Sequence, residues 1–436
     1  MKKIIRIMSL LIALIMAFSV VACSTSDAAY DGYMGGISAG GVTPDSSTEK
    51  GEDKGEGSET DETSNNQNVR LPAGMITAGA WVDNDNYQLW LDLFEQSSDE
   101  NGKDIFGKFN SFLEEKNSWG FNSLNRVKVT VKCGDEAVAG ATVIAQDSEG
   151  NALFSAVSDA QGNAYLFVSE NEGSIVVTSG EGSATAEFTK DERELEIMLE
   201  QKGDKLNVIE IMFVVDVTGS MGDEISFLKA ELDDIIRRIS ANDTNTAIKL
   251  AFLFYRDLTD NVPFAEYGFC DATDFSDMQA MLAILNEQGA KGGGDNPEAV
   301  DEALKRAVNA QWSTGNTTKI IFHVLDAPAH SGEKYRKKFN EAVNTAAEKG
   351  IRICPVICSG ADTLTEYTMR EAAIYTGGTF IFVTDDSGIG NAHHDPELPN
   401  VTVELLNSMI VRLVKGYHTG TFEDPIYWKQ DPNLAK

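Results

Sequence analysis

Basic residues are scarce in this chain of 436 residues, which has 36 Lys and Arg against 68 Asp and Glu and a formal net charge of −32. No basic stripe is visible anywhere in the sequence, and recognition of a phosphate backbone depends on clustered Lys and Arg. We therefore do not expect nucleic acid as a partner. The length exceeds that of one compact domain, so two or three domains are expected.

Cysteine is also rare, with five residues and no CxxC pair, so neither a disulfide-stapled scaffold nor a zinc ribbon is expected. Cys354 and Cys358 fall in one predicted strand, where four residues span ~13 Å. A disulfide cannot bridge that separation. Both cysteines are predicted to be buried as small apolar residues.

Common catalytic motifs are missing. Thr218 stands two residues before Ser220, so the GxSxG nucleophile elbow fails. The sequence has no GxxxxGK[ST] loop, HExxH helix, DxDxT-like acid pair, kinase glycine loop or HRD. We expect no enzymatic activity, and a metal-dependent hydrolase is the less favoured alternative, because a bound cation can activate water.

A long apolar run occurs only at the start, where Lys2, Lys3 and Arg6 precede a hydrophobic stretch that ends in small residues. Residues 1–22 are therefore predicted to be an export signal. The end of this run, Val-Val-Ala-Cys, resembles a bacterial lipobox, which implies cleavage before Cys23 and lipidation of that residue. The alternative is one membrane-spanning helix, for which ~20 apolar residues are needed. Both alternatives place the rest of the chain outside the membrane, and we expect a lipid-anchored protein on the extracytoplasmic face.

Residues 23–69 are predicted to be a disordered acidic tether. Positions 41–68 contain no aromatic residue, Leu, Ile or Met, and they carry eight acidic residues and two Lys. Such a segment cannot bury enough apolar surface to order itself.

Residues 70–124 are predicted to be a helical segment whose apolar residues pack in a core. These residues recur at helical spacing: Tyr87, Trp90, Leu91 and Phe94, then Phe106, Phe109 and Phe112.

Residues 125–201 alternate apolar and polar side chains, as in Val127, Val129 and Val131, with turn residues at 147–151 and 158–163. This pattern predicts a small β-sandwich. The stretch is similar to carboxypeptidase-regulatory-like, transthyretin-like modules, which usually act as spacers.

Residues 206–418 alternate buried strands with helices, which is typical of an open α/β sheet. A C-terminal tail follows at 419–436. We expect strands at 208–215, 248–255, 318–325, 351–358 and 379–384, a helix whose apolar face runs from Ile225 to Ile239, and further helices at about 274–287, 297–311, 333–349, 362–376 and 401–416.

A carboxylate and two hydroxyls follow the first of these strands, because Asp216, Thr218 and Ser220 alternate in the next loop. Alternation in an extended loop points all three the same way. Asp326 follows a later strand, at the sheet edge where ligands gather in open α/β folds. Oxygen donors of this kind suit Mg²⁺ or Ca²⁺, so the sequence predicts a divalent-cation site.

The region 206–418 resembles a von Willebrand factor type A domain. The metal-ion-dependent adhesion site of that family has the pattern Asp-x-Thr/Ser-x-Ser, then a Thr after a Gly-rich turn, then an Asp after a later strand. Asp216, Thr218, Ser220 and Asp326 match it. The resemblance implies a doubly wound, mostly parallel sheet flanked by helices, with Mg²⁺, Ca²⁺ or Mn²⁺ at the site and no organic cofactor.

Position 295 departs from this pattern, since Asp295 stands in the turn Gly-Gly-Gly-Asp-Asn-Pro-Glu where many members have Thr. A subgroup with the turn GGGDxPE is similar here, in its YRD at 255–257 and in a DAPxH-like turn at 326–330. A third carboxylate would give three negative charges against two positive ones. We therefore hypothesise that the site prefers Ca²⁺ or accepts a neutral ligand oxygen.

Simpler roles remain open for some of these residues. Ser220 with Asp223, and Asp295 with Glu298, could be helix N-cap arrangements. His330 could hydrogen-bond a ligating carboxylate from outside the metal shell, or it could be a solvent-facing turn residue.

The sequence predicts a cell-surface binding or adhesion protein that recognises a protein or matrix ligand through the cation. An envelope assembly or scaffold role is the alternative. In relatives the last helix slides when the site is occupied, but we expect residues 401–416 to form a fixed core helix.

Overall fold

The structure of the protein is a computed structural model that describes residues 76–98, 102–241, 246–294, 296–387, 398–399 and 401–435. The predicted export signal, Cys23, the predicted tether and Asp295 lie outside these residues. Within the described ranges, no helix is both long and apolar enough to cross a membrane.

The largest sheet of the described chain has eight strands in the order β14-β13-β12-β15-β16-β17-β1-β18. The five strands from β13 to β17 in this order run parallel, whereas β14 and β1 pair antiparallel with their neighbours. This arrangement confirms the predicted α/β class. The strands are β1 Thr77–Trp81, β12 Val208–Asp216, β13 Ala247–Tyr255, β14 Phe264–Asp271, β15 Thr317–Leu325, β16 Ile351–Ile357, β17 Phe380–Val383 and β18 Glu404–Leu405.

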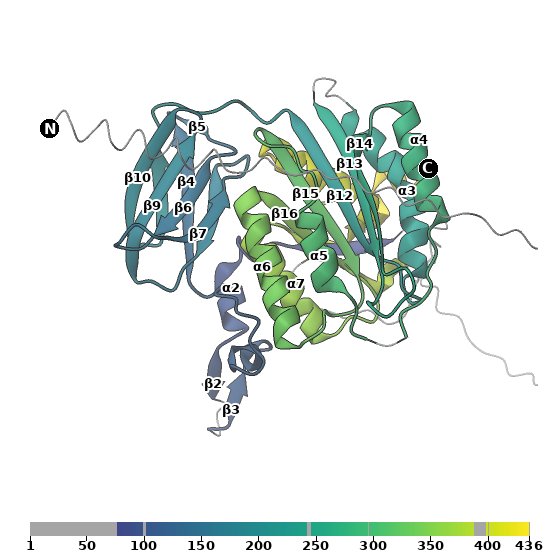
Figure 1. Cartoon of the computed structure of the whole chain (residues 1–436), viewed down its shortest axis with the longest axis horizontal. Coiled ribbons are helices and arrows are strands. Elements are labelled where there is room, and N and C mark those ends of the chain that lie inside the picture. The colour runs from purple at the N-terminus through teal and green to yellow at the C-terminus, as the bar shows by residue number, and fades with distance from the viewer. Residues whose placement is uncertain are drawn as a thin grey trace, which may run out of the picture. The chain divides into compact units, whose positions relative to one another are not determined.

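Helices cover both faces of this sheet (Figure 1). Central strands such as β12 send alternate apolar side chains to the two faces: Phe213 joins one core cluster and Val214 the other. Both faces must therefore be covered, which explains the continuous apolar runs of these strands. One cluster includes α3 Gly222–Ser240, α4 Phe275–Glu287 and α8 Leu406–Thr419, and the other includes α5 Val300–Val308, α6 Glu333–Lys349 and α7 Thr363–Thr376.

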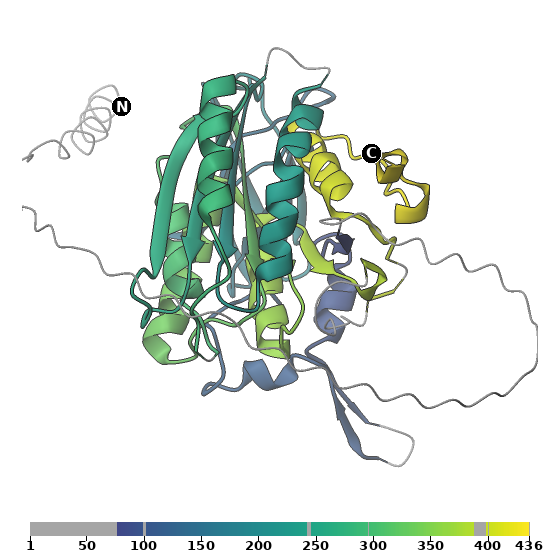
Figure 2. The ribbon, with the colours of Figure 1, turned by 90° about the vertical axis from the view of Figure 1, so that its right-hand side faces the viewer.

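The prediction of a helical segment over residues 70–124 is wrong. The structure has β1 inside the large sheet, a six-residue helix α2 Tyr87–Asp92, a hairpin of β2 Gln96–Ser98 and β3 Asp104–Phe106, and a 3₁₀ turn η1 Asn110–Leu113. In Figure 2 the hairpin extends away from the sheet. Backbone hydrogen bonds hold the base of this hairpin together: the N–H groups of Gly107 and Phe109 donate to the carbonyls of Glu95 and Leu93 at 2.8 Å each. Aromatic residues at helical spacing thus meet through a chain reversal.

Residues 126–198 form two small sheets that enclose a core of their own. One sheet has the order β10-β9-β6-β7; the other pairs β11, β4 and β5, with β8 joined to β4. This is the predicted sandwich architecture, and its kinship with spacer modules stays a prediction. Phe154 and Phe167 contact Tyr375 of α7, with Phe167 stacked at 4.3 Å. The bounds are β4 Arg126–Cys133, β5 Glu136–Ala137, β6 Thr142–Gln146, β7 Ala152–Val157, β8 Asn163–Phe167, β9 Glu172–Ser179, β10 Gly182–Thr189 and β11 Glu194–Met198.

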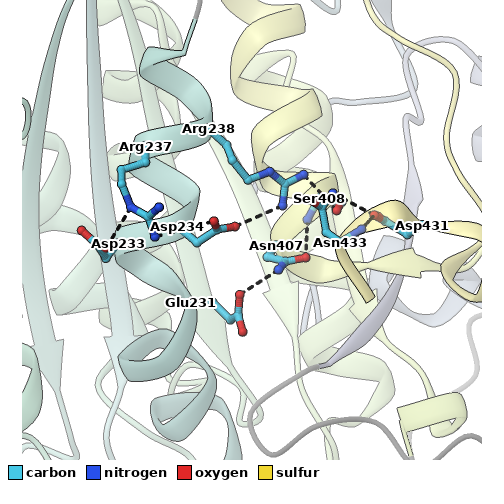
Figure 3. Close-up of polar contacts among 9 residues, drawn as sticks. All are labelled: Glu231, Asp233, Asp234, Arg237, Arg238, Asn407, Ser408, Asp431 and Asn433. Carbon is cyan, nitrogen blue, oxygen red and sulfur yellow. Dashed lines mark hydrogen bonds and ion pairs between the residues drawn. The ribbon is translucent and has the colours of Figure 1, made fainter. Parts of the chain in front are cut away.

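Polar contacts join the last helix α8 to α3 (Figure 3). The Arg238 guanidinium donates to Ser408 Oγ at 3.0 Å, and the Asn407 amide donates to Glu231 at 2.7 Å. The segment beyond α8 includes the short turns η3 Trp428–Gln430 and η4 Pro432–Ala435. Trp428 is buried against Leu405 of β18, so this segment packs on the edge of the sheet.

Candidate metal centre

Asp216 ends β12 and is fully buried. Its Oδ1 accepts the backbone N–H of Thr218 at 2.8 Å and the Thr218 hydroxyl at 2.7 Å. Helix α3 begins two residues after Ser220, at Gly222. The predicted alternation therefore places Asp216 and Thr218 in direct contact at the carboxyl end of the strand.

Asp326 follows β15, the neighbour of β12, and is buried at the same edge of the sheet. Burial raises its pKa, and a hydrogen bond from the Ser220 side chain partly opposes that shift. Asp326 in turn raises the pKa of Asp216. The structure thus brings together four of the five residues predicted to bind metal, and the fifth, Asp295, is not described.

The N-cap alternative for Ser220 is wrong, and the one for Asp295 falls on a residue outside the described ranges. The N-cap of α3 is Met221 and that of α5 is Ala299, and neither makes a side-chain cap hydrogen bond. Because Ser220 precedes the cap position of α3, its hydroxyl is free to contact Asp326.

A glycine turn brings a further carboxylate to the site. Gly293 has a φ of +61°, and a Cβ added there would lie 2.6 Å from Glu298 Oε1 and 2.8 Å from Thr218 Cβ. Only glycine permits this close approach. The turn is held in place from Gly219, whose N–H donates to the Gly292 carbonyl at 3.2 Å.

Glu298 is the residue that the sequence analysis missed, because it was considered only as a capping acid. It is 3 % exposed, and burial followed by repulsion from Asp216, Asp257, Asp260 and Asp326 raises its pKa to about 8. Its place in the motif Gly-Gly-Gly-Asp-Asn-Pro-Glu was the available signal.

The local turn of Asp216 recurs elsewhere, so the turn alone does not identify a metal site. Asp271 accepts the N–H and hydroxyl of Thr273 at 2.9 and 2.7 Å, in the same way that Asp216 accepts those of Thr218. Asp271 is exposed, and these bonds lower its pKa. At Asp216, burial outweighs the same bonds and raises the pKa to about 7. Burial and neighbouring carboxylates, not the Asp-x-Thr turn, distinguish the candidate site.

A divalent cation is compatible with this arrangement. Asp216 Oδ2 and Glu298 Oε2 are buried and have no hydrogen-bond partner among the described residues. Unpaired buried carboxylate oxygens are costly, and a cation would satisfy them. Hydroxyl donors are needed as well, because no three His, Cys, Asp or Glu side chains of the described chain lie close enough to hold a metal by themselves.

Among the described residues, His330 makes no hydrogen bond to Asp216 or Asp326. Its Nε2 lies 2.9 Å from Asp257 Oδ1, and its ring stacks on Tyr335 at 4.8 Å. Asp257 also accepts the Thr259 hydroxyl at 2.7 Å. Burial alone would raise the pKa of Asp257, but these two contacts outweigh it and the pKa falls. The pair therefore joins the β13–β14 loop to the loop after β15.

The positive charge of Arg256 lowers the pKa of Asp216. The Arg256 Nε donates to the Lys291 carbonyl at 2.8 Å, and Nη1 donates to the Val262 carbonyl at 3.3 Å. Arg256 therefore holds the entry to the glycine turn and forms no ion pair with the described carboxylates.

Residues 210–384 match the family model of the von Willebrand factor A domain. The chain contains a von Willebrand factor A (VWA) domain. Asp216, Thr218 and Asp326 all lie within the matched residues, and the strand β1 that joins the same sheet lies outside them.

Curated relatives match this chain over part of their length. A protein named as an ariadne-like RING finger protein, from Acanthamoeba polyphaga mimivirus, is 32 % identical over 142 residues, which are 33 % of this chain and 13 % of the relative. The alpha-protein kinase vwkA of Dictyostelium discoideum is 26 % identical over 126 residues, which are 29 % of this chain and 19 % of the kinase. The chain therefore spans less than a fifth of the length of either relative.

Among solved structures, proximal thread matrix protein 1 from the mussel byssus, with a zinc-occupied MIDAS motif, is similar with a TM-score of 0.32 and 11 % identity. That similarity covers 48 % of each chain. Within this chain, the residues that match the VWA model are one part of a larger described unit, which also contains the sandwich and β1.

Proposed function

We propose that this chain is a binding protein whose VWA domain recognises its ligand through a divalent cation. Asp216, Thr218, Ser220 and Asp326 would hold the cation, which would act as a Lewis acid for a ligand oxygen. One observation carries the proposal: Asp216 Oδ2 and Glu298 Oε2 are buried beside the site without a partner. A buried carboxylate cluster that lacks its own cation is the arrangement that a metal would complete.

The ligand is expected to present a neutral oxygen, because the site is more negative than the predicted ligands alone would make it. Glu298 adds a third carboxyl group near Asp216 and Asp326, to which it is coupled by charge rather than as a common set of metal ligands, and it does so whatever Asp295 contributes. Three carboxylates exceed the charge of a divalent cation, so an acidic ligand is disfavoured. Leu258 and Val262 are exposed on the β13–β14 loop beside the glycine turn. Such apolar side chains at the rim suit a protein ligand.

We further propose where the protein is located in the cell and what kind of protein it is. It is a non-enzymatic protein of the cell surface, anchored through a lipid on Cys23, that binds a protein or matrix ligand. A scaffold in the cell envelope is the second candidate, because it would use the same surface chemistry. The export-signal pattern of residues 1–22 supports the address.

Calorimetric titration of Mg²⁺, Ca²⁺ and Mn²⁺ into the metal-stripped full chain tests the site. The chain must include β1, because that strand lies between β17 and β18. We expect saturable binding that is lost in Asp216→Asn and kept in Asp271→Asn, which alters the same turn at an exposed position. Absence of binding by the wild type, or equal loss in both variants, would refute the proposal.

Two further measurements sharpen it. Asp295→Thr and Glu298→Gln should each shift preference from Ca²⁺ towards Mg²⁺ if surplus negative charge sets the choice. A pull-down from envelope extracts and from matrix proteins, with and without chelator, separates adhesion from assembly. A matrix protein released by chelator supports adhesion, and an integral envelope partner supports the scaffold role.

A further inference from the structure

Two turns of the sandwich share the sequence Asp-x-x-Gly-Asn but lie in different environments. Asp147 accepts the N–H groups of Glu149 and Asn151 at 2.9 and 2.8 Å, and Asp159 accepts those of Gln161 and Asn163 at 2.8 Å each. The first turn is exposed and hydrogen bonds from Asn151 lower the pKa of Asp147. At the second turn, burial raises the pKa of Asp159. Because the two turns have the same backbone hydrogen bonds, the raised pKa of Asp159 comes from its surroundings.

Asp159 lines a cavity of about 440 Å³, a volume in the size range of small-molecule binding sites. It is lined from four segments of the chain: the loop after β1, the Asp159 turn, the end of α7, and α8 with the residues that follow it. Three aromatic rings contribute to its wall, those of Tyr165, Tyr417 and Phe422. The cavity does not touch the candidate metal centre.

Close backbone approach builds one side of this cavity. Gly420, with a φ of +75°, lies so near the sandwich turn that an added Cβ would come 2.7 Å from the Ala160 carbonyl. Phe422 packs directly over Gly416, where a side chain of any size would displace its ring. The segment after α8 is therefore fitted to the turn that carries Asp159.

The charged residues that line the cavity differ in whether they form an ion pair. Arg412 is engaged by Glu404 through Nε at 2.9 Å and through Nη2, so its charge is neutralised. Asp159 and Asp85 also line the cavity and make no direct ion pair with a described residue, although the charge of Arg352 acts on Asp159 and the charges of Lys128 and Arg126 act on Asp85. Two arginines lie behind the wall: Arg126 is 5.6 Å from the Tyr165 ring and Arg352 is 5.2 Å from the Tyr417 ring.

Tyr165 places a further polar group on the wall of the cavity. It is only 9 % exposed and lines the cavity, and its hydroxyl makes no hydrogen bond to any described residue. Tyr417, which also lines the cavity, has its hydroxyl hydrogen-bonded to the Thr379 hydroxyl at 2.6 Å.

We propose that this cavity binds a small organic cation, an ammonium or guanidinium group on an apolar stem, with Asp159 and Asp85 as its counter-charges and the Tyr165 hydroxyl as a hydrogen-bond acceptor. Carboxylates pair with such groups through charge-assisted hydrogen bonds. The aromatic wall suits the stem and attracts the cation. The strongly acidic net charge of the chain favours the approach of a cation as well.

Agmatine is the probe, since it carries both cationic groups on an apolar stem, and glutarate is the anionic control. Titration into the full chain should show saturable agmatine binding and none of glutarate. Asp159→Asn should weaken the binding by about tenfold or more, the scale of a charge-assisted contact. Asp147→Asn, which changes the twin turn outside the cavity, should leave it unchanged.

Tyr165→Phe keeps the proposal testable if Asp159→Asn does not fold, because it removes only the hydroxyl. We expect it to weaken agmatine binding about threefold to tenfold, as for one neutral hydrogen bond. The proposal is overturned if agmatine does not bind saturably, if glutarate binds instead, or if Asp147→Asn and Asp159→Asn have equal effects. Metal titration is unaffected by these variants in either case, so this test is independent of the VWA proposal.

Discussion

Two buried charged clusters in this chain handle their carboxylates in opposite ways. In the first, the Arg370 guanidinium donates to Asp83 through Nε at 3.0 Å and through Nη2, and to Glu366 at 3.1 Å. Lys108 pairs with the other oxygen of Glu366 at 2.7 Å. Burial alone would lower the pKa of Arg370, but the two carboxylates outweigh it and raise the pKa. Two carboxylates face two cations.

In the second cluster, Asp216, Glu298 and Asp326 lie at the edge of the sheet without an ion pair to any described residue. Burial raises the pKa of all three, and mutual repulsion adds to the effect on Asp216 and Glu298. The first cluster is complete within the protein, whereas the second has no ion-paired counter-charge among the described residues.

The difference separates structure from function. The complete cluster joins the N-terminal segment to α7, because Asp83 follows β1 and Arg370 lies in the helix. Its rings also enclose the guanidinium, with Trp90 at 5.3 Å and Phe109 at 5.5 Å. A cluster that satisfies itself stabilises a fold, whereas an unsatisfied one at a strand end is available to a ligand.

The largest effect is expected from breaking the complete cluster. Asp83→Asn leaves the buried Arg370 with one counter-charge fewer, so the free energy of unfolding should fall by about 3–5 kcal/mol. Chemical denaturation measures this loss. Asp233→Asn is the control, because its pair with Arg237 is exposed and should contribute about 0–1 kcal/mol. Similar losses in both variants would show that Arg370 is not dependent on Asp83.

The same substitution in the second cluster should have the opposite sign. Without metal at pH 8, Asp216→Asn removes a crowded charge and keeps an oxygen for Thr218, so the protein should gain about 1–2 kcal/mol. With metal at a hundred times its dissociation constant, the wild type should gain about 2.7 kcal/mol and the variant nothing. Destabilisation of the metal-free protein by Asp216→Asn would contradict the comparison.

Glu371 shows a third way to bury a carboxylate, which is to keep its proton. It is buried, accepts the Ser123 hydroxyl at 2.8 Å, and burial raises its pKa to about 8. Between the unfolded pKa and pH 8 the folded state binds more protons than the unfolded state, so stability falls as pH rises, by up to about 1.4 kcal/mol per pH unit. Below the unfolded pKa the contribution is complete.

Glu371→Gln tests this by removing the titration. Denaturation curves at pH 5 to 8 should show a smaller decline with pH in this variant than in wild type. The exposed Glu341→Gln should leave the decline unchanged. An unaltered decline in Glu371→Gln would mean that this carboxyl is already ionised in the folded protein.

The central strands were predictable because each is a continuous apolar run buried on both faces. The predicted ranges 248–255 and 318–325 differ from β13 and β15 by one residue. Strands β14 and β1 were missed for physical reasons. The first is half-exposed at an edge, and the second is five residues whose partners lie some 300 positions away. Local patterning carries no information about such pairing.

The site was predictable where polar residues follow a predicted strand. Asp216 ends β12 and Asp326 follows β15; the alternation of strands and helices predicted that both lie at one edge of the sheet, whereas the adjacency of these two strands came from the structure. The role of Glu298 was not predicted, because it depends on the approach of Gly293 to Thr218. The buried cysteines were correctly predicted: Cys354 and Cys358 are buried and free.

The smallest effect is expected at the boundary of the second cluster. The negative charge of Asp257 helps to raise the pKa of Glu298, but the oxygens of Asp257 already contact His330 and Thr259. Asp257→Asn should therefore change Mg²⁺ or Ca²⁺ affinity less than about threefold, because contacts with His330 and Thr259 already occupy its oxygens and offset its charge. Calorimetry beside Asp216→Asn measures both. A tenfold loss of metal affinity in Asp257→Asn, reproduced by His330→Gln, would place this pair within the metal centre. It would also show that a carboxylate with hydrogen-bond partners in the protein can still belong to the site.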